Sequence, residues 1–83
     1  MLGTVDNVNL FLMPIKKQLI SIKLGESIKS IRESKSLTQE QLASKAGLYR
    51  TYIGQIERAE KNITLVNLEI IAKALDINIK ELL

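Results

Sequence analysis

The apolar residues of this chain follow a helical period from residue 22 onward. Leu24, Ile28 and Ile31 recur at i, i+4 and i+7 with polar residues between them, which predicts an amphipathic first helix. Residues 1–21 instead scatter Gly and Asn among their apolar residues and show no sustained helical period. We therefore expect an N-terminal extension over residues 1–21 and a helical domain over residues 22–83.

Two short helices are predicted close together in the middle of the chain. The first helix should end near residues 34–36, and Thr38 and Gln41 then have the spacing of a capping box, which marks a new helix N-terminus. That second helix should stop at Gly47, because glycine tolerates the positive φ of a helix C-terminus. A third helix over residues 49–58 follows at once. Two short helices joined by a turn that contains Gly are typical of a helix-turn-helix motif.

The C-terminal third predicts a fourth helix and a dimer surface. Thr64 is a candidate N-cap for a helix over residues 65–75, and Asn78 for a last short helix over residues 79–83. The fourth helix carries two neighbouring apolar stripes, Leu65, Leu68, Ile71 and Leu75 on one and Val66 and Ile70 on the other. This arc is wider than one small core needs, so we expect a self-complementary interface between two copies. The residues assigned to that interface are Val66, Ile70, Ile77, Ile79, Leu82 and Leu83. The alternative is that all of them fill the core of one chain.

Composition excludes several classes of function. The chain has 83 residues, of which 46% are hydrophobic and 25% charged, as expected for one folded domain. It contains neither Cys nor His, so disulfides, thiolate zinc sites and imidazole acid–base catalysis are excluded. We predict no enzymatic activity, no metal site and no cofactor. A net charge of +3 is compatible with a polyanionic partner but does not identify one.

The sequence does not predict a membrane protein. The most apolar stretch, residues 9–15, contains Pro14 and is followed by two lysines, so it is too short to cross a bilayer. A signal peptide would place its positive residues before the apolar run, which this stretch does not do. We expect a cytoplasmic protein.

The two faces of residues 49–58 differ in chemistry. At about 100° per residue, Ile53 and Ile56 fall together and should face the core, with Glu57 beside them. The opposite face collects the polar positions Arg50, Thr51, Gly54, Gln55 and Arg58. Arg and Gln pair bidentately with guanine and adenine, a Thr methyl contacts thymine, and a glycine would let a duplex approach closely. The alternative is a solvated helix face, but the capped helix and Gly turn before it favour a DNA-reading helix with Arg50, Thr51 and Gln55 as the base-reading residues.

Other polar residues around this face are candidates with simpler alternatives. Tyr52 would contact a base or phosphate, or its ring would lie along the protein surface. Gln39, in the first turn of the second helix, would meet a phosphate or only cap the helix. Further phosphate candidates, each alternatively a solvated side chain, are Lys45, Arg58, Lys61 and Asn62. If the first helix packs across the third, Arg32 and Glu57 would form a largely buried ion pair that fixes the two helices.

Three segments resemble the phage repressor and Cro-like (XRE-type) helix-turn-helix family. They are residues 24–29 (LGESIK), 37–43 (LTQEQLA) and 53–58 (IGQIER). Residues 50–53 (RTYI) and 62–65 (NITL) further resemble controller proteins of restriction–modification systems. The resemblance implies an all-α, compact five-helix fold like that of the λ repressor. In that fold the second and third helices bind DNA, and the last two contribute to the dimer.

The resemblance also assigns roles to single positions. Base-reading positions are matched by Arg50, Thr51 and Gln55, phosphate-side positions by Gln39 and Tyr49, and the interhelical ion pair by Arg32 and Glu57. Two residues depart from the family pattern. Ser36 stands where the family often has Gly, and Tyr49 where a small capping residue is more usual.

These expectations combine into a homodimeric, sequence-specific transcription regulator on a pseudo-palindromic operator. The controller of a restriction–modification system is its specific form. The alternatives are a prophage-type repressor and an antitoxin-like module whose main partner is a protein, the latter motivated by the N-terminal extension. Double-stranded DNA and a second copy of the chain are the expected partners, and RNA polymerase is a candidate.

Overall fold

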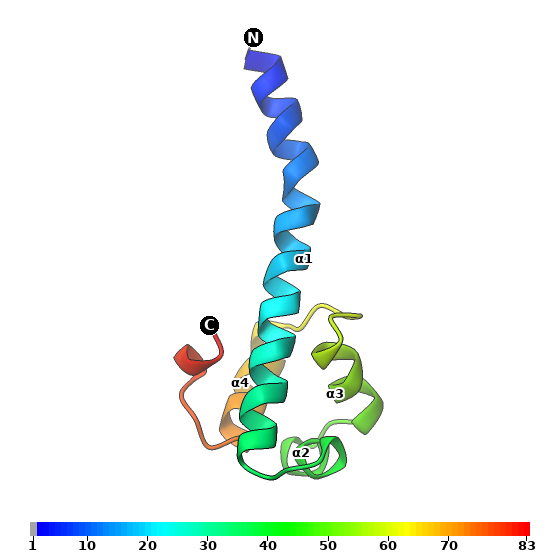
Figure 1. The fold of residues 1–83 in the computed structure, drawn as a ribbon, viewed down its shortest axis with the longest axis vertical. Coiled ribbons are helices and arrows are strands. Elements are labelled where there is room, and N and C mark those ends of the chain that lie inside the picture. Colours follow the sequence, from blue (N-terminus) through cyan, green and yellow to red (C-terminus); the bar gives the residue numbers. More distant parts are fainter. Residues whose placement is uncertain (1) are drawn as a thin grey trace.

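The computed structural model describes the backbone of residues 2–83 and the side chains of residues 18–83. Residues 2–83 form four α-helices and one short 3₁₀ helix, with no strand among them. The elements are α1 (Leu2–Ser34), α2 (Gln39–Ala46), α3 (Arg50–Glu57), α4 (Leu65–Ala74) and η1 (Ile79–Glu81). The predicted all-α class is confirmed, with η1 as the fifth helical element. Figure 1 shows the later elements gathered around the C-terminal half of α1.

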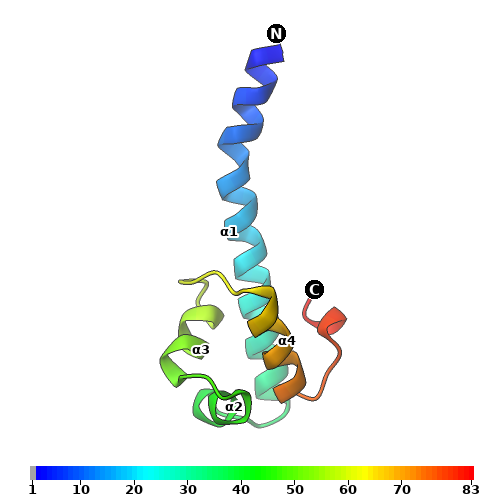
Figure 2. The ribbon, with the colours of Figure 1, turned by 180° about the vertical axis from the view of Figure 1, so that it is seen from behind.

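The first helix is longer than the sequence pattern predicts. α1 has 33 residues and begins at Leu2, so the backbone of residues 2–21 is helical although their apolar residues show no sustained helical period. A helix that is already established gains one hydrogen bond with each added residue, so it can extend without presenting a single apolar face. Its N-terminal half stands away from the other helices (Figure 2). The radius of gyration is accordingly 15.3 Å, against about 12 Å for a compact chain of this length.

α1 is the longest helix, and spanning a membrane would require both length and apolar character. Neither this helix nor any other within the described residues combines the length and the apolar character needed to span a bilayer.

Side-chain caps determine where the shorter helices begin. The Thr38 hydroxyl accepts a hydrogen bond from the backbone N–H of Gln41 at 3.0 Å, and the Gln41 side chain accepts one from the N–H of Thr38 at 2.8 Å. The predicted capping box is therefore confirmed. Thr64 caps α4 and Asn78 caps η1, as the sequence predicts.

The four α-helices end in the same backbone motif. A residue of positive φ follows each helix: Ser36, Ala59 and Asp76 at 58°, and Gly47 at 68°. In each case the N–H of the next residue bonds back to a carbonyl five residues earlier, at 2.8–3.1 Å, which is the Schellman motif. Glycine adopts this conformation without steric cost, whereas the other three side chains make it unfavourable by about 1 kcal/mol each.

One apolar core lies between α1, α2, α3 and α4. Its fully buried large side chains are Ile28, Leu42, Ile53, Ile56, Ile71 and Leu75. Two apolar residues of the C-terminal third differ sharply in exposure, and the assignment of Leu82 to the dimer surface is corrected. Leu65 is 68% exposed, because it lies in the first turn of α4 at the edge of the buried stripe. Leu82 is 2% exposed and packs in the core, because η1 folds back on α4 and carries it inward.

α1 and α3 approach each other where α1 has no side chain. A Cβ added to Gly25 would lie 2.5 Å from the carbonyl oxygen of Ile56 and 2.7 Å from that of Glu57. Both distances are shorter than any normal contact of a Cβ atom with an oxygen. The absence of a side chain at Gly25 therefore allows α3 to pack directly against α1, and this contact sets the position of α3.

Candidate nucleic-acid interface

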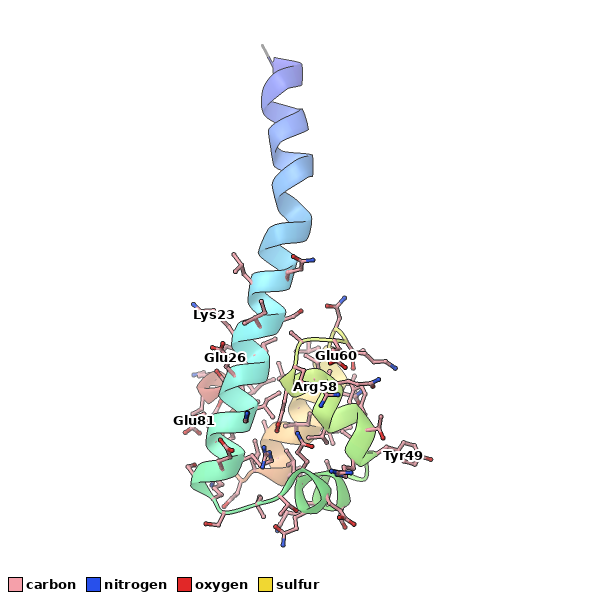
Figure 3. The ribbon with its side chains drawn as sticks, turned by 45° about the vertical axis from the view of Figure 1, so that its right-hand side comes forward. Lys23, Glu26, Tyr49, Arg58, Glu60 and Glu81 are labelled. Carbon is pink, nitrogen blue, oxygen red and sulfur yellow. The ribbon has the colours of Figure 1, made fainter. Side chains whose placement is uncertain are left out.

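The turn between α2 and α3 leaves an aromatic ring on the surface. Gly47 ends α2 with φ 68°, and the N–H of Leu48 bonds to the carbonyl of Ala43 at 2.9 Å. Tyr49 then occupies the N-cap of α3, but its side chain makes no capping hydrogen bond and is 85% exposed. Figure 3 shows this ring projecting away from the helices. The ring is therefore available to contact a partner.

A buried hydrogen-bond network joins α1, α2 and α3. Arg32 donates to both carboxylate oxygens of Glu57, from Nε at 2.6 Å and from Nη2 at 3.0 Å, and the side chains are 9% and 2% exposed. Arg32 also donates to the carbonyl of Leu37 at 2.7 Å. The hydrogen bond to Glu57 raises the pKa of Arg32, against a smaller opposing effect of burial. The structure thus brings together the two residues that the sequence proposed as an interhelical pair.

The same carboxylate orients Gln39. The amide nitrogen of Gln39 donates to Glu57 Oε1 at 2.9 Å, and a carboxylate can only accept hydrogen bonds, so the nitrogen end of the amide must face it. The amide oxygen is then directed toward Gly54, 3.5 Å from where a Cβ would stand. Gln39 does not form the cap of α2, which belongs to Thr38 and Gln41.

Two adjacent hollows on the outer side of α3 gather most of the predicted contact residues. One, of about 190 Å³, is lined by Gln39, Arg50, Thr51, Gly54 and Arg58. The other, of about 500 Å³, is lined by Leu48, Tyr49, Thr51, Tyr52, Gln55, Lys61 and Asn67. Thr51 lines both hollows, so the predicted base-reading residues form one continuous surface. Lys45 and Asn62 are exposed but line neither of these two hollows.

The surface at Gly54 is not open, although the helical wheel placed this glycine on the outer face of the helix. It is buried, and a Cβ added to it would lie 3.0 Å from Arg58 Nη1. The side chains of Gln39 and Arg58 cover it, with Gln39 Oε1 3.5 Å from the position of that Cβ. The expectation of close approach of a duplex at Gly54 is therefore corrected.

Tyr52 has a partner within the chain. Its ring is half-buried against the core, and its hydroxyl oxygen accepts a hydrogen bond from the Asn67 side-chain amide of α4 at 2.9 Å. The ring therefore lies along the protein with one edge in the larger hollow. Asn67 was missed in the sequence, since nothing local links two residues 15 positions apart on different helices.

An exposed ion pair follows α3. Arg58 donates from Nε to Glu60 Oε2 at 2.7 Å and from Nη2 to Glu60 Oε1 at 3.2 Å, and Figure 3 shows the two side chains at the C-terminal end of α3. The hydrogen bond to Arg58 lowers the pKa of Glu60, and the same bond raises the pKa of Arg58. Nearby, the Ser21 hydroxyl donates to the Asn62 side chain at 3.0 Å. Glu60 was not among the residues predicted from the sequence, because DNA contacts are expected from positive and hydrogen-bond-donating side chains.

The residues assigned to the dimer surface differ in exposure. Val66 is 66% and Leu83 80% exposed, whereas Ile77 and Ile79 are half-buried against the core. Ile70 is also half-buried. Leu82 is buried and cannot contact a second copy of the chain. Leu65, which the sequence places on the first apolar stripe of this helix, adds an exposed apolar side chain beside Val66.

The described side chains offer no evident metal site. No group of three or more Asp or Glu side chains lies close enough together to hold a metal ion within this part of the chain.

The chain is similar in sequence and in fold to known helix-turn-helix proteins. The profile of the helix-turn-helix family HTH_3 matches residues 28–82. The chain is 52% identical over 60 residues to the control protein C.SmaI of Serratia marcescens, covering 72% of this chain and 71% of that protein. It is 46% identical over 65 residues to the control protein C.BamHI of Bacillus amyloliquefaciens, covering 77% and 80%. The crystal structure of the restriction-modification controller protein C.AhdI of Aeromonas hydrophila matches with a TM-score of 0.75 and 43% identity, over 76% of this chain and 96% of that one.

Proposed function

Because this chain belongs to the helix-turn-helix family HTH_3, we propose that it is a sequence-specific, DNA-binding transcription regulator that acts as a homodimer. The observation that carries this proposal is the outer face of α3, where exposed Arg50 and Thr51 lie beside two hollows that share Thr51. This face is rich in hydrogen-bond donors, and α3 has a length suited to the major groove. Similarity to the control proteins C.SmaI and C.BamHI supports the control of restriction–modification genes as its specific role.

The proposed contacts divide into base reading and phosphate binding. Arg50, Thr51 and Gln55 read base edges, and the free edge of Tyr52 contributes beside them. The phosphate contacts we propose are Gln39, Lys45, Tyr49, Arg58, Lys61 and Asn62. Gln39 uses its second amide hydrogen for this contact, since the first is engaged by Glu57. The pair of Arg32 and Glu57 has an architectural role, because it is buried behind the contact surface.

The homodimer forms through the apolar face of α4 and the C-terminus. Leu65, Val66 and Leu83 are each at least 66% exposed and would be covered by a second copy, with the partly exposed Ile70, Ile77 and Ile79 around them. A twofold dimer would present two α3 helices to half-sites about 34 Å apart on one side of the duplex. We further propose that the dimer contacts RNA polymerase when its operator lies beside a promoter. The protein would then act in the cytoplasm on DNA, with no enzymatic activity of its own.

The DNA-binding proposal is tested by selecting duplexes from a random library with the purified protein and measuring affinity for the selected and scrambled sequences. We expect Arg50→Ala to lose about 1–3 kcal/mol on the selected duplex and to relax the preference at one base position. Lys61→Ala should weaken binding to both duplexes equally, because a phosphate contact carries no base information. Equal affinity of the unaltered protein for selected and scrambled DNA would contradict sequence-specific function.

The dimer face has its own test. Val66→Lys places a charge in the proposed interface and should shift sedimentation toward the monomer. Leu19→Lys is the matched control, since Leu19 is a 55% exposed apolar residue on α1, and it should leave the dimer intact. If only the Leu19 variant dissociates, the interface lies on α1 instead.

A further inference from the structure

Arg58 and Glu60 form a bidentate pair on the proposed DNA surface. Two guanidinium nitrogens of Arg58 bind the two carboxylate oxygens of Glu60 at 2.7 and 3.2 Å. The third, Nη1, lies over Gly54 in the hollow shared with Arg50 and Thr51. The side chains are 56% and 52% exposed, so an incoming anion has access to the pair. The two-oxygen geometry of a carboxylate on Arg is also that of a phosphate on Arg.

The backbone holds Glu60 in this position. Ala59 has φ 58°, and the N–H of Glu60 bonds to the carbonyl of Gln55 at 2.8 Å. Two residues further on, the Asn62 side chain is tied to Ser21 of α1. The segment that carries Glu60 is thus attached to α3 at one end and to α1 at the other. The backbone therefore places Glu60 beside Arg58, whose guanidinium its carboxylate binds.

We propose that Glu60 is an intramolecular substitute for a DNA phosphate, which occupies Arg58 in the free protein and must be displaced when DNA binds. This inference rests on the proposed function, in which Arg58 is a phosphate contact. Displacement leaves a carboxylate near the DNA backbone, so Glu60 lowers affinity both by competition and by repulsion. Since phosphates are the same at every position, the effect applies to all sequences alike. Glu60 thus sets the overall affinity and its salt dependence without changing base preference.

The experiment compares Glu60→Gln with Glu26→Gln on the selected and scrambled duplexes over a range of salt concentrations. Glu26→Gln makes the same change of charge at an exposed residue of α1. Glu26 lies on the side of α1 that faces away from Arg58 and Glu60 (Figure 3). We expect Glu60→Gln to bind both duplexes more tightly, by up to about fivefold at low salt. The slope of log affinity against log salt should become steeper by at most about 0.9, the value for one phosphate contact. Glu26→Gln should leave both quantities unchanged.

The Arg58→Ala background separates competition from a general charge effect. In that background, Glu60→Gln should give clearly less gain, because the guanidinium for which carboxylate and phosphate compete is absent. An equal gain with and without Arg58 would overturn the inference, as would no gain at all, an equal gain from Glu26→Gln, or a changed base preference. In each of these cases the unaltered protein still discriminates between the duplexes and the proposed function stands. If it binds no duplex, or binds both equally, the proposed function itself fails.

Discussion

Gly25→Ala tests whether the contact between α1 and α3 determines stability. Alanine is favoured over glycine inside a helix by about 0.5–1 kcal/mol, so propensity alone predicts a more stable protein. The added Cβ, however, would lie 2.5 and 2.7 Å from two carbonyl oxygens and 3.1 Å from a carbonyl carbon of α3. These are backbone atoms, which cannot rotate away as a side chain could, so α3 must move. Overpacking of this kind costs about 1–3 kcal/mol, and we place this case at the upper end of that range.

The net expectation for Gly25→Ala is a loss of about 2 kcal/mol, or a melting temperature roughly 8–16 °C lower for a domain of this size. Urea denaturation followed by circular dichroism at a fixed protein concentration measures it. Ser30→Ala is the matched control, because Ser30 is exposed on the same helix and gains propensity without a clash. It should be as stable as the unaltered protein or slightly more so. If Gly25→Ala is also at least as stable as the unaltered protein, the close contact of α1 and α3 is not what positions α3.

Three further predictions concern charge and backbone. Arg32→Met should cost about 3–5 kcal/mol in urea denaturation, because it leaves the Glu57 carboxylate buried without its cation. Adding Glu57→Gln to this variant should restore part of the lost stability. If the double variant is less stable than Arg32→Met alone, an unpaired buried charge is not the cause of the loss. Ser36→Gly should stabilise by about 0.5–1 kcal/mol, since φ is 58°, and a thermal melt that falls would contradict this. The pKa of Glu60, followed by carboxyl NMR, should lie below its ordinary value and return toward it in Arg58→Ala. Because the pKa of Glu60 is lowered in the folded state, its pair with Arg58 stabilises the fold at pH values above the ordinary pKa of a glutamate. This stabilisation is lost as the pH falls through the lowered pKa.

The boundaries of the shorter helices were predictable because their signals are local. Thr38 and Gln41 satisfy each other's backbone within four residues, and Gly47 adopts positive φ in the turn that follows. The outward direction of Arg50 and Thr51 was likewise predictable, since it depends only on helical period and on the burial of Ile53.

The surroundings of these residues were not predictable, because they depend on contacts between elements. The helical wheel gave Gly54 the correct direction, but not the cover formed by the side chains of Gln39 and Arg58. The partner of Tyr52 lies on α4, and Leu82 is buried only because η1 folds back. The helix before residue 22 was missed for another reason. Pro14 and the irregular apolar pattern argue against a packed helix, and this part of α1 projects without packing on the other helices.

The position of α3 is therefore set by residues behind its outer face, of which only Gln39 is also a proposed DNA contact. An isolated helix of eight residues is unstable in water, so its neighbours must hold it. Gly25 determines how near α3 lies to α1, while the carboxylate of Glu57 is bound by Arg32 from α1 and Gln39 from α2. A displaced α3 would carry Arg50 and Thr51 out of register with the major groove even if every side chain on its outer face were unchanged. Variants at Gly25 or Arg32 that still fold should consequently lose affinity for the selected duplex more than for the scrambled one, because base contacts require exact placement of α3 while phosphate contacts tolerate small shifts.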